Sequence, residues 1–135
     1  MSKAKVLIID DDPDIALATR MCLEDNDYEV VEARSRGEGL QKVQAENPDL
    51  IVLDVMMDTA TAGFQTALAI RSNDPESEYL KYRDIPIIML TAIHDTTNVR
   101  FGPDEEYLPV DEFIDKPIDP EKFIVVVEKL LNAKS

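Results

Sequence analysis

The sequence predicts an α/β domain in which a parallel sheet is covered by helices on both faces. A short apolar run followed by a helix-like segment recurs five times along the 135 residues. This alternation is typical of parallel strands joined by right-handed crossovers. Three of the apolar runs are continuous rather than alternating, as expected for strands buried on both faces. The length suits one domain with a real core, so we expect a single domain over residues 1–135.

Five apolar runs mark the expected strands. The first, third and fourth are continuous over four residues, whereas the second and fifth are shorter and are assigned mainly from their position. In chain order the runs are Val6–Ile9, Val30–Val31, Leu50–Leu53, Ile87–Leu90 and Phe113–Ile114.

Start and stop signals define the first two helices. Asp12-Pro13 supplies an N-cap and a proline at the first helical position, which predicts a helix to about Glu24. Ser35-Arg-Gly-Glu38 has the pattern of a capping box and opens the second helix. Asn47-Pro48 ends that helix before the third strand.

The remaining helix signals are uneven. Apolar residues near helical spacing predict a helix over Gly63–Arg71, and Asp119-Pro120 opens a last helix with an apolar stripe. The fourth helix should lie within residues 93–111, but Gly102-Pro103 and Pro109 interrupt this segment. We therefore expect that helix to be short or irregular.

Composition narrows the function classes. The net charge of −14 and the pI near 4.3 oppose direct binding to nucleic acid or to an anionic membrane, and they suit cations and basic partners. A single cysteine, Cys22, excludes an internal disulfide and a multi-thiolate zinc site within one chain. The first residues lack a signal-peptide pattern and no stretch approaches a membrane span, so we expect a cytoplasmic protein.

Polar side chains follow four of the strands, at the edge of the sheet where ligands bind in open parallel sheets. Several carboxylates gathered at one edge need a compensating cation, and oxygen ligands suit Mg²⁺. An aspartate there is a competent nucleophile for accepting a phosphoryl group, with the metal, the hydroxyl and the ammonium around its oxygens. These residues are Asp10, Asp11, Asp12, Asp54, Thr91 and Lys116.

Each of these residues also has an ordinary structural interpretation. Asp12 suits a helix N-cap better than a metal ligand, and Asp10 or Asp11 alone would be a turn acid. A lone Thr91 would be a strand-end hydroxyl, and a lone Lys116 a surface lysine. The agreement of four separate strand ends is what favours a phosphoryl-transfer site.

Four motifs together resemble the signatures of response-regulator receiver domains, over about Lys5 to Leu131. The resemblance implies a doubly wound, five-stranded, flavodoxin-like three-layer sandwich with strand order 2-1-3-4-5. The motifs are Ile8-Ile-Asp-Asp-Asp-Pro13, Leu50-Ile-Val-Leu-Asp-Val-Met-Met57, Ile87-Ile-Met-Leu-Thr-Ala92 and Phe113-Ile-Asp-Lys-Pro117.

The resemblance also implies a metal site around the phosphoacceptor. Asp54 matches the residue that accepts the phosphoryl group. Asp11 matches the direct ligand of Mg²⁺, or of a similar divalent cation such as Mn²⁺, while Asp10 acts largely through water. The backbone carbonyl of Met56 completes the protein's share of the ligands.

Three further residues match the switch of such domains. Thr91 corresponds to the hydroxyl that moves toward the phosphoryl group, and Phe113 to the aromatic residue whose rotamer follows it. Lys116 corresponds to the phosphate-contacting lysine, and its bond to Pro117 is expected to be cis.

The chain departs from the family pattern in three places. Asp58 stands where a proline is usual, and residues 58–63 form a loop that is one residue longer than usual. The segment 93–111, which contributes to the surface that reports phosphorylation in the family, is longer and broken. The output geometry is therefore open, although the phosphorylation motifs are complete.

The resemblance implies a signalling switch and not an enzyme acting on other substrates. It would take its phosphoryl group from a histidine kinase or phosphotransfer protein and change its binding to a downstream protein. An alternative is a phosphorylation-independent interaction module on the same fold. A phosphohydrolase would need a second acid at position 56, where Met56 stands, and a flavin-binding protein would need a phosphate loop after the first strand.

Overall fold

The computed structural model describes residues 4–54, 70, 76, 82, 84–91, 112–115 and 119–134. Residues 36, 54, 91, 112, 113, 115, 133 and 134 are described by backbone position alone. The elements are β1 (Lys5–Ile9), α1 (Pro13–Glu24), β2 (Glu29–Ala33), α2 (Arg36–Glu46), β3 (Leu50–Asp54), β4 (Ile87–Thr91), β5 (Glu112–Asp115) and α4 (Pro120–Lys134).

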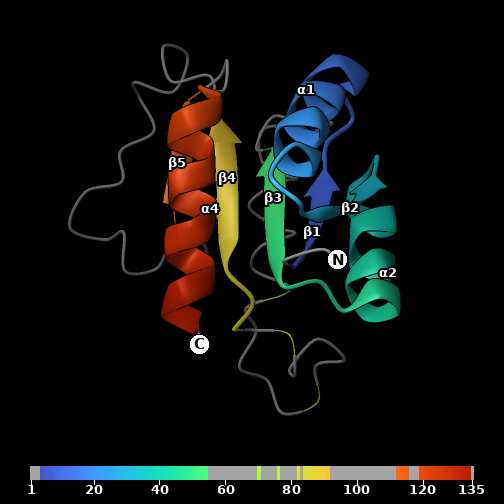
Figure 1. The fold of residues 1–135 in the computed structure, drawn as a ribbon. Coiled ribbons are helices and arrows are strands. Elements are labelled where there is room, and N and C mark those ends of the chain that lie inside the picture. The colour runs from blue at the N-terminus through green and yellow to red at the C-terminus, as the bar shows by residue number, and fades with distance from the viewer. Residues whose placement is uncertain are drawn as a thin grey trace, which may run out of the picture.

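The five strands form one parallel sheet in the order β2-β1-β3-β4-β5 (Figure 1). This confirms the doubly wound topology and the strand order that the sequence motifs imply. The chain moves outward from β1 to β2 and then returns past β1 to β3. The reversal of direction between β1 and β3 is the point at which open α/β sheets place their ligands.

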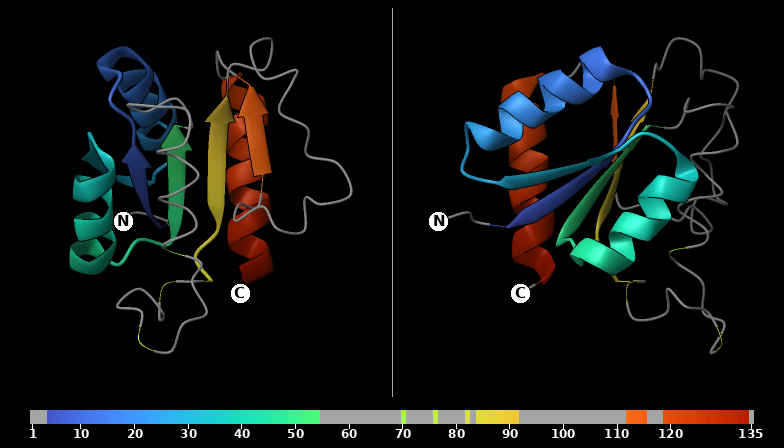
Figure 2. Two further views of the ribbon diagram at one scale, coloured as in Figure 1. Left: turned by 180° about the vertical axis from the view of Figure 1, so that it is seen from behind. Right: turned by 90° about the vertical axis from the view of Figure 1, so that its right-hand side faces the viewer.

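Helices cover both faces of the sheet and make three layers. Figure 2 shows α1 and α4 on one face and α2 on the other. One buried cluster joins the sheet to Ala16 and Leu23 of α1 and to Phe123 of α4. A second cluster joins the opposite face to Val43 of α2. Two cores of this kind explain why the central strands are apolar on both faces.

The central strands are buried along their whole apolar runs. Residues 6–9 of β1, 50–53 of β3 and 87–90 of β4 are all at most 1% exposed. Their side chains alternate between the two clusters: Leu7 and Ile9 face α2, whereas Val6 and Ile8 face α1 and α4. The continuous apolar pattern therefore reflects burial from two sides, as predicted.

The predicted starts of α1 and α2 are confirmed. The side chain of Asp12 accepts hydrogen bonds from the backbone N–H groups of Asp14 and Ile15, at 2.9 and 3.3 Å, and Pro13 opens α1. Ser35 Oγ accepts from Glu38 N at 3.2 Å at the start of α2. Glu38 Oε1 accepts a hydrogen bond from the backbone N–H of Arg34, at 2.8 Å, whereas in the predicted capping box it would accept from that of Ser35.

Two predicted helices fall largely outside the described residues. Of Gly63–Arg71 only Ile70 is described, and it is helical and buried. The fourth-helix segment, residues 93–111, lies entirely outside them. Among the described helices, none combines the length and the apolar character that a membrane span requires.

Candidate functional site

The carboxyl ends of the five parallel strands meet at one edge of the sheet, which we call the rim. The pairing register aligns Ile9 with Leu53, Leu53 with Met89, and Met89 with Phe113. Residues that follow these positions along each strand therefore lie side by side at the rim. Because side chains alternate along a strand, the register also decides which residues can share one face.

Asp10 is a buried acid at the rim. It follows β1, is only 1% exposed, and its backbone N–H donates to the carbonyl of Ala33 in β2 at 3.0 Å. Its Oδ1 accepts a hydrogen bond from Asp12 N at 2.9 Å. Asp11 is exposed at the same loop. The structure therefore places one buried and one exposed carboxylate shortly before the N-terminus of α1.

Asp54 is the last residue of β3 and pairs in register with Leu90 of β4. Ile9 of β1 pairs with Leu53 of β3, so the residues that follow them, Asp10 and Asp54, lie next to each other. Their backbones are about 4.8 Å apart, which is the spacing of neighbouring strands. The structure thus brings these two predicted site residues to adjacent strand ends. The prediction had Asp54 just after the strand, and it is instead the final strand residue.

Thr91 and Phe113 are placed by their backbones. Thr91 ends β4 and pairs with Asp115, one position beyond the Asp54 level. Phe113 pairs with Met89, two residues before Thr91. Phe113 therefore lies in its predicted strand, whereas Thr91, predicted to follow the fourth strand, is the last residue of that strand. Met56, Asp58, Lys116 and Pro117 lie outside the described residues, so their predicted roles stay predictions.

The donor atoms at the rim fit a hard divalent cation. The residues available there carry carboxylate oxygens, which Mg²⁺ and Mn²⁺ accept as ligands. A carboxylate as buried as Asp10 also costs free energy in its charged form unless donors or a cation compensate it. Among the side chains that the structure describes, no three His, Cys, Asp or Glu residues gather as a metal site, and Asp54 is not among those side chains.

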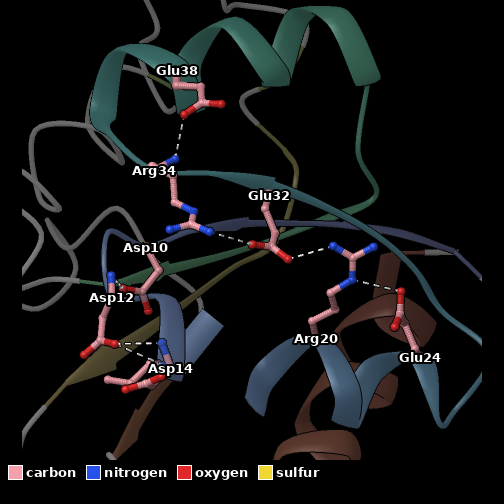
Figure 3. A network of polar contacts seen from close by, with 9 residues as sticks. Asp10, Asp12, Asp14, Arg20, Glu24, Glu32, Arg34 and Glu38 are labelled. Carbon is pink, nitrogen blue, oxygen red and sulfur yellow. Dashed lines mark hydrogen bonds and ion pairs between the residues drawn. The ribbon is translucent and has the colours of Figure 1, made fainter. Parts of the chain in front are cut away.

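An ion-pair network lies beside the rim on the α1 side of β2 (Figure 3). Glu32 of β2 is shared by two arginines, with Arg20 Nη1 at 2.8 Å and Arg34 Nη2 at 3.9 Å. Arg20 also pairs with Glu24 within α1 at 3.0 Å. Its hydrogen bonds to Glu32 and then to Glu24 raise the pKa of the Arg20 guanidinium.

Arg34 is the rim residue that the sequence interpretation missed. It follows β2 directly, just as Asp10 follows β1, and Ile9 pairs with Ala33 in the register. The rule that selected the polar residue after each of the other strands also selects Arg34. The apolar run of the second strand, Val30–Val31, is too short to show where the strand ends, so Arg34 could not be assigned to its end.

Comparisons with known proteins place the chain in a family. Residues 6–128 match the family model described as the response regulator receiver domain. The chain is 33% identical to the transcriptional regulatory protein ResD of Bacillus subtilis over 134 residues, which are 99% of this chain and 50% of ResD. It is 32% identical to the alkaline phosphatase synthesis transcriptional regulatory protein PhoP of the same organism, over 95% of this chain and 48% of PhoP.

The fold leads to the same family. The crystal structure of the signal receiver domain of a signal transduction histidine kinase from Syntrophus aciditrophicus matches with a TM-score of 0.79 at 27% identity, covering 96% of this chain and 91% of that one. The chain spans about half the length of ResD and PhoP. Both relatives are named as transcriptional regulators. The comparisons therefore do not support the expectation that a protein of their full length makes no contact with nucleic acid. With the sheet order, the rim and these matches in agreement, the chain belongs to the response regulator receiver domain family.

Proposed function

We propose that this chain accepts a phosphoryl group on Asp54, in a reaction that depends on a divalent cation, and thereby switches its binding to a partner. The observation that supports this most directly is the β1–β3 register, which brings Asp10 and Asp54 to adjacent strand ends at the point where the strand order reverses. The buried Asp10 follows the strand next to that of the acceptor, and the exposed Asp11 is the next residue along the chain.

The reaction assigned to Asp54 is a nucleophilic displacement at phosphorus. One carboxylate oxygen forms a bond to phosphorus while the bond from phosphorus to the donor breaks, and the electron pair of that bond leaves with the donor. The donor is a phosphohistidine imidazole or a small acyl phosphate. The product is an acyl phosphate on Asp54.

Asp10, Asp11, Asp54 and the backbone carbonyl of Met56 are the residues we assign to the cation. When bound, Mg²⁺ supplies positive charge that offsets both the carboxylates and the phosphoryl oxygens. Asp11 would be the direct ligand and Asp10 would act largely through water, while the hydrogen bond from Asp12 N orients Asp10 Oδ1.

We assign Thr91, Lys116 and Phe113 to the response after transfer. The Thr91 hydroxyl and the Lys116 ammonium take phosphoryl oxygens, and the Phe113 ring follows the hydroxyl. The Lys116–Pro117 bond is assigned as cis. Thr91 ends β4, which pairs with β3, and Phe113 lies within β5, which pairs with β4; this neighbouring placement supports the assignment.

The proposal extends to partners and context. Residues 1–135 act as a single receiver domain in the cytoplasm, the phosphoryl donor is a histidine kinase or a phosphotransfer protein, and a downstream protein reads the switch. The net charge of −14 favours a basic protein surface as the partner of this segment over nucleic acid or an anionic membrane. Its own phosphorylation and dephosphorylation are the only reactions it promotes.

The test is intact-mass analysis after incubation with acetyl phosphate, with and without Mg²⁺. We expect the wild type to gain one phosphoryl mass only with Mg²⁺, and Asp54→Asn to gain none because its amide is not a nucleophile for this step. Asp84→Asn is the matched control, because Asp84 is exposed and precedes β4 at the opposite end of the sheet.

The outcomes separate the two functions open for this fold. Equal phosphorylation of Asp54→Asn and the wild type would assign the acceptor to another residue. A wild type that binds Mg²⁺ but gains no phosphoryl mass would instead support a phosphorylation-independent interaction module.

A further inference from the structure

Arg34 is a half-exposed cation placed at the end of β2, next to the acids of the rim. The Asp10 backbone N–H bonds to the carbonyl of Ala33, so the next residue, Arg34, is the neighbour of Asp10 across β1 and β2. Two strand spacings, about 10 Å, separate its backbone from that of Asp54.

The side chain of Arg34 lies on the same side of the sheet as that of Asp10. Ile9 and Ala33 both face α2, so the residues after them turn to the α1 side by the alternation of strand side chains. The pairing of Arg34 with Glu32, which also binds Arg20 of α1, agrees with this direction (Figure 3).

The guanidinium of Arg34 is only loosely engaged. Its ion pair to Glu32 is 3.9 Å long, whereas Arg20 holds the same carboxylate at 2.8 Å, and the Arg34 side chain is 54% exposed. The shorter hydrogen bond of Arg34, to Glu38, is donated by its backbone N–H and does not involve the guanidinium. The five guanidinium donors can therefore respond to charges that arrive at the rim.

We propose that Arg34 sets the electrostatic potential of the rim, so that it weakens binding of the divalent cation and favours reaction with an anionic phosphodonor. This inference rests on the proposed function. A positive charge repels a cation and attracts a phosphate through the same field. In a chain with a net charge of −14, an anionic donor otherwise approaches the rim against repulsion.

The first measurement is the Mg²⁺ affinity by isothermal titration calorimetry at low ionic strength. For charges about 10 Å apart, loss of one charge changes the affinity for a divalent ion about two- to fourfold at low ionic strength. We therefore expect Arg34→Gln to bind Mg²⁺ more tightly than the wild type by about that factor. The difference should shrink as NaCl is added.

Two variants control for structure and for total charge. Arg34→Lys keeps the charge and should bind Mg²⁺ as the wild type does. Lys129→Gln removes the same charge from an exposed position on α4, more than two turns from the start of that helix, and should also match the wild type. A tightening in Lys129→Gln equal to that in Arg34→Gln would overturn the proposal, because total charge would then explain both.

The second measurement is the rate of phosphorylation by dianionic acetyl phosphate and by less charged phosphoramidate. We expect Arg34→Gln to slow the acetyl phosphate reaction about two- to fourfold and the phosphoramidate reaction less, since the field acts on donor charge. An equal loss with both donors would contradict a charge effect.

The two measurements also separate this inference from the proposed function. If Asp54 accepts no phosphoryl group, the proposed function fails while the Mg²⁺ titration still tests Arg34. If Arg34→Gln binds Mg²⁺ as the wild type does, Arg34 has no role at the rim although Asp54 can still be the acceptor. A wild type that binds no Mg²⁺ would overturn both.

Discussion

At the scale of single residues, Gly39 allows α2 to pack closely on β1. A Cβ at this position would lie 2.6 Å from Cδ1 and 3.0 Å from Cγ1 of Ile9, a side chain that is fully buried and has little room to move. Gly37, in the same helix, would place a Cβ with no atom within 4 Å. Neither glycine has a positive φ, so packing alone distinguishes the two positions.

We therefore expect opposite effects from two identical substitutions. Gly39→Ala should lower the free energy of unfolding by about 1 kcal/mol or more, because overpacking outweighs the better helix propensity of alanine. Gly37→Ala should raise it by up to about 1 kcal/mol, because only propensity acts there. Urea denaturation followed by circular dichroism measures both. Equal stabilisation in the two variants would show that the Ile9 side chain shifts to make room for the added methyl group.

The rim residues differ in how far local chemistry explains them. Asp12 is an N-cap whose bonds to Asp14 and Ile15 need only the adjacent helix. The environment of Asp10 depends on tertiary structure, because the residue is only 1% exposed once the sheet and the elements packed on it have formed. Three consecutive aspartates thus receive three environments, with Asp11 the exposed one.

At the scale of elements, α2 ends on a residue with left-handed backbone. Asn47 has φ 50° and ψ 59°, and its N–H donates to the carbonyl of Val43. This conformation turns the chain away from the helix toward β3. Asparagine tolerates it better than residues with bulkier or branched side chains.

Substitution of Asn47 tests this helix end. Asn47→Ala should lower the free energy of unfolding by about 1 kcal/mol, because alanine resists a positive φ. Asn47→Gly should retain or exceed the wild-type value, since glycine has no Cβ to clash. Thermal unfolding of the two variants gives the comparison. Similar losses in both would mean that the asparagine side chain, and not its backbone conformation, stabilises the end.

The edge strand β2 is joined to its neighbours by charge. Arg20 reaches it from α1, and Arg34 and Glu38 connect its end to the start of α2. Exposed ion pairs of this kind stabilise a fold by no more than about 1 kcal/mol each. Their importance is positional, because Glu32 binds the Arg20 guanidinium closely and leaves the Arg34 guanidinium only loosely engaged at the rim.

At the scale of the whole molecule, the net charge of −14 opposes the compact state. Raising NaCl from about 0.01 M to about 0.15 M shortens the Debye length from about 30 Å to about 8 Å, which screens this repulsion. The same salt weakens the described surface ion pairs, but these contribute little.

We therefore expect added salt to stabilise the protein. A gain of about 1 kcal/mol would raise the Tm by about 4 °C for a domain of this size. Differential scanning calorimetry across the salt series measures the shift, and a sucrose series of equal osmolality separates screening from solvent exclusion. A fall in Tm with salt would mean that the ion pairs outweigh the net repulsion.

The sequence by itself determined the order and type of the described elements. Continuous apolar runs mark β1, β3 and β4, and Asp12, Ser35 and Asn47 mark helix ends, because strand burial and capping depend on residues only a few positions apart. Because ligands bind at the carboxyl ends of parallel strands, the predicted sheet indicated Asp10 and Asp54 as site residues. The strand order itself came from the family motifs.

Tertiary structure decided which residues meet. The register that sets Asp10 beside Asp54, and Arg34 beside Asp10, depends on strand pairing between distant segments. The sharing of Glu32 by Arg20 and Arg34 depends on how α1 packs over β2. The close approach of Gly39 to Ile9 depends on how α2 packs over β1. Such contacts arise from the packing of several elements at once, so no local pattern in the chain encodes them.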